Sequence, residues 1–157
     1  MSRRRRVRHK IEVKDPRYDS TLVAKFVNTV MGSGKKSLAE RLVYAAIERA
    51  NEGSDNVDPL EILTRAVENS KPRVEVKSRR VGGATYQVPL EVTGNRQESL
   101  AIRWLVNFAR ARKGTPMHVA LSNEIRDAAA NSGSAVRRRD EMHKMAQANR
   151  AFAHFRW

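Results

Sequence analysis

The chain has no cysteine among its 157 residues, which excludes disulfide bonds and cysteine-ligated zinc. No apolar run approaches the ~20 residues that span a bilayer, and no apolar segment follows the basic start as a secretory signal requires. Acidic residues are scarce as well: 17 stand against 31 lysines and arginines, which gives a formal net charge of +14. We therefore expect a soluble cytoplasmic protein with no membrane partner, attracted to polyanions and above all to nucleic acid.

The positive charge is concentrated in a few segments. Residues 1–10 hold six cations and no acid, and residues 71–80 hold five cations and one acid. Residues 40–70, in contrast, hold three cations and seven acids. A coat that served only solubility would mix both signs evenly, so we expect the acidic segment to face away from the polyanion.

The start of the chain, residues 1–14, shows no apolar periodicity and contains four consecutive arginines, Arg3–Arg6. We expect it to be a disordered basic arm that becomes ordered on nucleic acid, followed by one domain over residues 15–157. A solubilising tail is the alternative. A mitochondrial presequence would also be rich in arginine, but the serines and the amphipathic helix of such a segment are lacking.

Apolar residues recur at helical spacing through most of the remaining chain. One helix is marked with particular clarity, because Asp58, Pro59 and Glu61 supply the cap, the first position and the third position of its first turn. Another carries Leu38 in its apolar stripe, and the last carries Met145. The predicted fold is a mainly α, single-domain bundle of about six helices. The helices are expected near residues 20–31, 38–51, 58–71, 97–112 and 115–128, and from 134 onward.

Residues 73–92 break this helical pattern and predict a β-hairpin inserted into the domain. Apolar and polar residues alternate on both sides of Gly82 and Gly83, which mark the turn. The polar positions of the first arm carry three cations and one acid, so the ribbon suits an anionic groove. An isolated ribbon is marginal in water, and its base should therefore pack on the helices.

The alternation also predicts the register of the hairpin. A two-residue loop would place Val74 opposite Glu91 and Val76 opposite Pro89, and the apolar faces of the two arms would then not coincide. We therefore predict a three-residue, bulged loop. Its pairs would be Val74 with Val92 and Val76 with Leu90.

Patterns that would support catalysis or cofactor binding fail on spacing. The segment GSGKKS at residues 32–37 lacks the glycine and hydroxyl positions of a phosphate-binding loop, so it predicts a helix connector that presents Lys35 and Lys36. The four histidines have no partner at metal-binding spacing, and no catalytic triad is recognisable. We expect no enzymatic activity, no cofactor, no metal and no small-molecule substrate.

Three further basic segments are candidates for contact with nucleic acid. Cations at the end of the fourth helix also suit the helix dipole, whereas those at the start of the sixth oppose it and favour a bound phosphate. The final segment, RAFAHFRW, mixes cations with Phe152, Phe155 and Trp157, which either stack on bases or dock on the bundle. The candidate cations are Arg110, Arg112 and Lys113 in the first cluster, and Arg137, Arg138 and Arg139 in the second.

Three long strings resemble one protein family: SRRVGGATYQVP at 78–89, SLAIRWLV at 99–106 and MAQANRAFAHFRW at 145–157. Together with ENSKPRVEV at 68–76, they resemble small ribosomal subunit protein seven in its bacterial form, over essentially the whole chain. One departure is Gly32 and Ser33, where the family usually carries a charged or polar pair.

The resemblance implies a helical protein with a protruding hairpin that binds small-subunit ribosomal RNA in its 3′ major domain. Such a protein nucleates the head of the subunit, lies near messenger RNA and exit-site transfer RNA, and touches the ninth and eleventh small-subunit proteins. The cations expected near ribosomal RNA are Arg3, Arg4, Arg5, Arg6, Arg8, Lys10, Lys35, Lys36, Lys71, Arg73 and Lys77. The tip expected near transfer or messenger RNA comprises Arg79, Arg80, Val81, Gly82 and Gly83.

Two other functions compete with this interpretation. An architectural DNA-binding protein would also use basic β-arms, although the tip at Val81 to Gly83 offers little to insert between bases. An enzyme acting on RNA would need a cluster of titratable groups that the sequence does not reveal.

Overall fold

Six α-helices, one two-stranded antiparallel hairpin and a short 3-10 helix make up residues 13–52 and 58–155, the part that the computed structural model describes. The predicted fold class, mainly α with one hairpin, is confirmed. The arm residues 1–12 lie outside the described part. The elements are α1 Thr21–Val30, α2 Lys36–Asn51, α3 Pro59–Ser70, β1 Val74–Val81, β2 Ala84–Glu91, α4 Gly94–Ala111, α5 Met117–Ala129, α6 Gly133–Ala148 and η1 Arg150–Phe155.

Helix starts follow the local sequence where capping residues are present. The Asp58 side chain accepts a hydrogen bond from the backbone N–H of Leu60 at 2.9 Å, and Pro59 occupies the first turn, as predicted. Helix α4 begins at Gly94, earlier than the predicted Gln97. Its first turn contains no apolar residue, so hydrophobic periodicity gave no sign of it.

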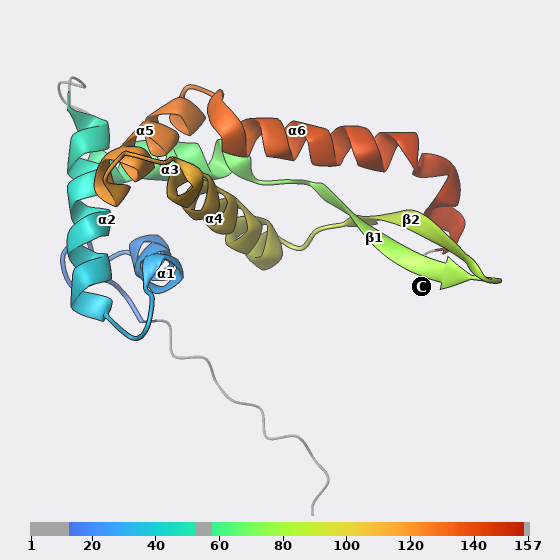
Figure 1. Ribbon diagram of the computed structural model, residues 1–157, viewed down its shortest axis with the longest axis horizontal. Coiled ribbons are helices and arrows are strands. Elements are labelled where there is room, and N and C mark those ends of the chain that lie inside the picture. Colours follow the sequence, from blue (N-terminus) through green and yellow to red (C-terminus); the bar gives the residue numbers. More distant parts are fainter. Residues whose placement is uncertain (1–12, 53–57, 156–157) are drawn as a thin grey trace, which may run out of the picture.

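Helix α5 is the centre of the bundle, because α2, α3, α4 and α6 all pack against it (Figure 1). Its Leu121 and Ile125 are fully buried, together with Phe26 of α1, Leu63 of α3 and Leu105 of α4. Each such side chain contributes about 1.5–3 kcal/mol through removal of apolar surface from water. Two predicted apolar positions lie outside this core, since Leu38 is 43% exposed and Met145 is 41% exposed.

A buried carboxylate fixes the direction of α6. The Glu124 side chain, 0% exposed, accepts hydrogen bonds from the backbone N–H groups of Ser134 at 3.1 Å and Ala135 at 3.0 Å. Its other oxygen pairs with Arg112 at 2.8 Å, and Arg112 also reaches Asp127 at 3.2 Å. The carboxylate thus caps the positive end of the α6 dipole and is neutralised by a guanidinium. Helix α6 then extends from the bundle alongside the hairpin (Figure 1).

The hairpin has a two-residue turn, and the predicted three-residue loop is wrong. Gly82 and Gly83 both have positive φ angles, 57° and 91°, as a tight type I′ turn requires. The observed pairs are those of a two-residue loop, with Val74 opposite Glu91 and Val76 opposite Pro89. At the turn itself, Val81 pairs with Ala84.

The register prediction failed because it assumed that only one face of the ribbon is covered. The observed register puts Val74 on one face and Tyr86 on the other. Val74 lines a hollow of about 580 Å³ between the hairpin and α6, whereas Tyr86 contacts Phe152 of η1. Apolar side chains are partly buried on both sides, so the two arms need not share one apolar face.

Two polar contacts tie the base of the hairpin to the helices. Glu75, almost buried, accepts hydrogen bonds from Nε and Nη2 of Arg96 at 2.9 and 2.7 Å. The backbone N–H of Arg73 donates to Nε2 of His143 at 3.0 Å. Burial lowers the pKa of His143, and the positive charges of Arg139 and Arg73 lower it further against the opposing effect of Asp140. The hydrogen bond requires the neutral ring, because a protonated imidazole has no acceptor.

Replacing Gly133 with alanine should lower the free energy of unfolding by about 2 kcal/mol, because a left-handed backbone is costly for an L-residue. Gly133 has a φ of +87°, and an added Cβ would lie 2.8 Å from Cβ of Asp127. Gly94→Ala is the matched control, since a Cβ added at Gly94 would have no neighbouring atom within 4 Å. That variant should stay within about 0.5 kcal/mol of the wild type in urea unfolding. Equal losses in the two variants would contradict the account.

His143→Gln should flatten the acid side of the stability profile. Because the folded-state pKa of His143 lies below its unfolded value, the unfolded chain takes up the proton first as the pH falls below about 6.5. Wild-type stability should therefore drop between about pH 6.5 and the folded pKa, and this part of the loss should vanish in the variant. Urea unfolding at several pH values measures it, and parallel profiles for the two proteins would refute the role of His143.

Candidate nucleic-acid interface

The chain enters the bundle through a tight turn held by Asp15. This carboxylate, 4% exposed, accepts hydrogen bonds from the backbone N–H of Arg17 and Tyr18 at 3.0 and 3.1 Å and from the hydroxyl of Tyr44 at 2.7 Å. Burial and this hydrogen bond raise the pKa of Tyr44 to about 12. The Arg17 guanidinium lies over the rings of both tyrosines and pairs with Glu48. The segment that follows the predicted arm is therefore fixed to α2.

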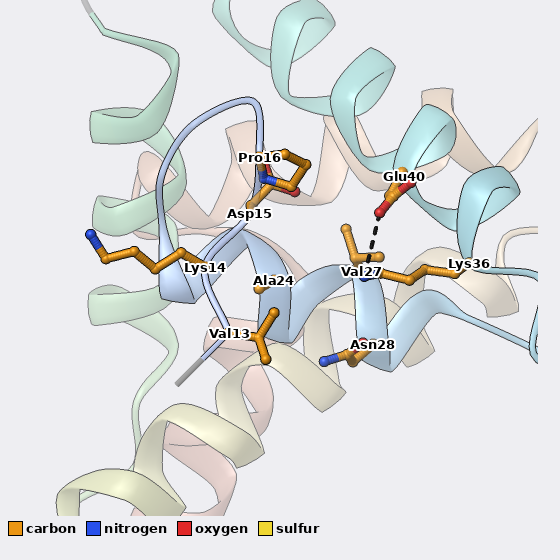
Figure 2. A pocket seen from close by; sticks show the side chains of 9 residues that line it. All are labelled: Val13, Lys14, Asp15, Pro16, Ala24, Val27, Asn28, Lys36 and Glu40. Atoms are coloured by element: carbon orange, nitrogen blue, oxygen red, sulfur yellow. Dashed lines mark ion pairs between the residues drawn. The ribbon is translucent and has the colours of Figure 1, made fainter. Parts of the chain in front are cut away.

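A hollow of about 160 Å³ lies beside this turn, where the described chain begins. Figure 2 shows Val13 and Lys14 of the entering segment, Asn28 of α1, and Lys36 and Glu40 of α2 around it. Lys36 and Glu40 form a loose ion pair, with Nζ and Oε1 3.7 Å apart. The predicted cation Lys36 thus lies at the rim of a polar hollow.

A second hollow, of about 340 Å³, continues this surface between α1 and α4. It is lined by Lys25, Asn28 and Thr29 of α1 and by Ser99, Ile102 and Arg103 of α4. Asn28 borders both hollows, so the two are adjacent. Lys25 is paired with Glu98 at 2.9 Å, whereas exposed Arg103 has no hydrogen-bond or ion-pair partner among the described residues. A polar surface therefore runs from the entry of the chain across α1 to α4, and it carries cations along its length.

Several predicted binding cations are already engaged within the protein. Arg110 donates to the carbonyl oxygens of Thr29 and Val30 at 3.2 and 3.0 Å, and so caps the end of α1. Arg112 neutralises Glu124. Arg139 donates to the carbonyl of Asn69 and pairs with Asp140 at 2.7 Å. The amides at the start of α6, where we expected a phosphate, are capped by Glu124. Weaker local partners serve Lys71 (Glu68), Arg137 (Ser134) and Arg138 (Glu141).

Other predicted cations are exposed and have no side-chain partner among the described residues. Lys35 follows the end of α1, and Lys113 follows the end of α4. Because Arg110 joins these two helix ends, both lysines belong to the same end of the bundle. Arg73 and Arg80 lie at the base and near the tip of the hairpin and are likewise exposed. The arm residues Arg3, Arg4, Arg5, Arg6, Arg8 and Lys10 lie outside the described part.

Arg79 and Arg80, which the sequence groups together, have different surroundings in the hairpin. Arg80 points to solvent near the turn, while half-buried Arg79 donates to the carbonyl oxygen of Phe155 in η1. Lys77 is exposed, and its Nζ lies 3.7 Å from Oε1 of Glu75. Arg79 is thus tied to the C-terminal segment rather than presented at the tip, and its proximity to RNA stays a prediction.

The open question of Phe152 and Phe155 is answered by their contacts. Both rings pack on Tyr86 of β2, with centroids 5.1 and 5.0 Å away. They dock on the hairpin, and neither is exposed as a platform for stacking bases. Trp157 lies outside the described residues.

Sequence reasoning missed Lys25, Arg103 and Lys144, which are exposed on the helices. Runs of neighbouring cations marked the candidates, whereas these three stand singly within the polar faces of amphipathic helices. A helical projection of α4 would have found Arg103, because Ile102 and Leu105 on either side are buried.

No three histidine, aspartate or glutamate side chains within residues 13–52 and 58–155 gather closely enough to hold a metal ion. In the same part of the chain, no helix has the length and apolar character needed to cross a membrane.

Comparison with known proteins agrees with the resemblance drawn from the sequence. A family model described as ribosomal protein S7p/S5e matches residues 2–150. Small ribosomal subunit protein uS7 of Akkermansia muciniphila is 72% identical over 157 residues, which cover all of both chains. The uS7 proteins of Halorhodospira halophila and Mycolicibacterium smegmatis are 52% identical over all of both chains and 57% identical over 92% of each. The chain therefore belongs to the ribosomal protein S7p/S5e family.

Proposed function

We propose that this protein is a structural component of the small ribosomal subunit that binds the 3′ major domain of its ribosomal RNA and nucleates assembly of the subunit head. The observation that carries the proposal is the continuous polar surface over the entering segment, α1 and α4, which carries Lys14, Lys36, Lys25 and Arg103. It is a cytoplasmic ribosomal protein without catalytic activity. Its hairpin lies near messenger RNA and exit-site transfer RNA, and the ninth and eleventh small-subunit proteins are its neighbours.

The basic side chains divide into two roles under this proposal. Arg110, Arg112 and Arg139 hold the bundle and α6 in shape. Lys35, Arg103 and Lys113, which lack partners among the described residues, face the RNA backbone, where each neutralised phosphate releases counterions. Fixed helices carrying separate cations suit recognition of a folded RNA by shape, rather than reading of a base sequence.

The hairpin is ill suited to the competing function of architectural DNA binding. A DNA-bending arm inserts freely into the minor groove and wedges an apolar side chain between bases. Here the ribbon adjoins α6 and meets η1, and its turn offers only Gly82 and Gly83. These features favour a ribbon held at a fixed angle against a structured RNA.

The choice between RNA and DNA can be made by competition. At about 0.15 M salt, a 3′-domain fragment of small-subunit ribosomal RNA should displace duplex DNA of equal length, because docking on a specific RNA shape adds to the non-specific charge term. Fluorescence anisotropy with labelled duplex measures the displacement. Preference for the duplex, or equal affinity for both, would refute the proposed function.

Arg103→Ala should weaken binding of the same RNA fragment and reduce the salt dependence of its affinity. Loss of one phosphate contact lowers the magnitude of the slope of log K against log salt by up to ~0.9. Arg65→Ala is the matched control, since Arg65 is exposed on α3, also without a partner among the described residues, but belongs to the acidic segment. The control should leave the slope unchanged. Equal effects of the two variants would mean that the α1–α4 surface has no special part in binding.

A further inference from the structure

The C-terminal 3-10 helix η1 and the end of α6 contact the hairpin at two separate places. Near the base, the Arg73 amide bonds His143 of α6. Farther out, Phe152 and Phe155 pack on Tyr86, and Arg79 donates to the Phe155 carbonyl. Between these places lies the hollow of about 580 Å³, lined by Val74 and Pro89 of the hairpin and by α6 and η1. The segment formed by α6 and η1 therefore holds the ribbon at two places, in addition to the pair of Glu75 with Arg96 of α4 at its base.

The two attachments hold the ribbon in different ways. The inner one is a backbone hydrogen bond from the Arg73 N–H at the start of the hairpin, whereas the outer one is made by Tyr86 and Arg79, which cross-strand pairing puts on a single face of the ribbon. A two-stranded ribbon held only at its base could still rock about that point. The outer contact restrains that rocking, so it decides how far the tip can move.

The outer contact is small and is made by the end of the chain. The three rings form one cluster, in which Phe152 and Phe155 are themselves 6.4 Å apart and nearly parallel. No residue of this cluster belongs to the continuous core formed by the helices. It can therefore open without unfolding the bundle, as expected for a satellite cluster under a projecting element.

We propose that η1 is a latch that sets the position of the hairpin, with Phe152 and Phe155 as positioning residues that act through Tyr86. Arg79 completes the latch through its bond to the Phe155 carbonyl. The consequence for RNA binding rests on the proposed function, because it assumes that Lys77 on the hairpin meets ribosomal RNA. The latch holds Lys77 where it can reach a phosphate, so that the ordering of the ribbon is complete before binding.

The latch is tested first in the free protein by hydrogen exchange measured with mass spectrometry. In the full chain, Phe152→Ala and Phe155→Ala should each speed exchange of the amides in residues 77–88 on the order of 10-fold, because the aromatic contacts that hold the ribbon are lost. Exchange in α5 should stay as in the wild type. Met145→Ala is the control, since Met145 is exposed on α6 outside the ring cluster, and it should leave the hairpin unchanged. Unchanged exchange of residues 77–88 in both phenylalanine variants would overturn the latch.

The second measurement separates the latch from the proposed function. Affinity for the 3′-domain ribosomal RNA fragment is determined for Lys77→Ala in the wild-type chain and in the Phe152→Ala chain. If η1 positions the hairpin, Lys77→Ala should lower the RNA affinity several-fold in the wild-type chain and clearly less in the Phe152→Ala chain. Equal costs would overturn the positioning role. If hairpin exchange accelerates but Lys77→Ala costs nothing in either chain, the latch holds the ribbon and RNA contact at Lys77 is refuted.

Discussion

The carboxylate of Glu124 is the constraint on which the rest of the structure depends. It is fully buried, so its charge must be matched inside the protein, and Arg112 on one side and the amides of α6 on the other do so. The same group that closes the α4–α5 connection therefore also sets the direction in which α6 leaves the bundle. Since α6 and η1 contact the hairpin, this buried group also helps to place the ribbon, together with the pair of Glu75 and Arg96 at its base.

The surplus of positive charge is used in two different ways. Some guanidinium groups turn inward and cap helix ends or neutralise carboxylates, as Arg110 does on α1 and Arg139 does on the end of α3. Others, such as Arg103, face solvent without a partner among the described residues. A protein that binds a polyanion needs both, because the first group fixes the shape and the second group supplies the contact.

Much of the fold was accessible from local patterns, and the failures have a common physical cause. The start of α3 was predicted correctly because Asp58 and Pro59 act within a single turn. The presence of the hairpin was also predicted correctly, because the alternation of apolar and polar residues is a local pattern. Its register was wrong, since which faces are covered depends on α6 and η1, distant in the sequence. The candidate cations show the same limit: a run such as Arg110 to Lys113 marks a charged segment but does not say which side chains have partners.

The sequence by itself determined the class of partner, the helical and hairpin elements and the family, because net charge, periodicity and long strings of residues need no knowledge of contacts. Only the tertiary structure decided which cations lack partners among the described residues and that Phe152 and Phe155 dock on Tyr86. It also decided the two-residue turn of the hairpin, because both faces of the ribbon are partly covered. Those outcomes depend on neighbours brought together across many residues. A tightly packed interior admits one arrangement of such neighbours, and local pattern carries no record of it.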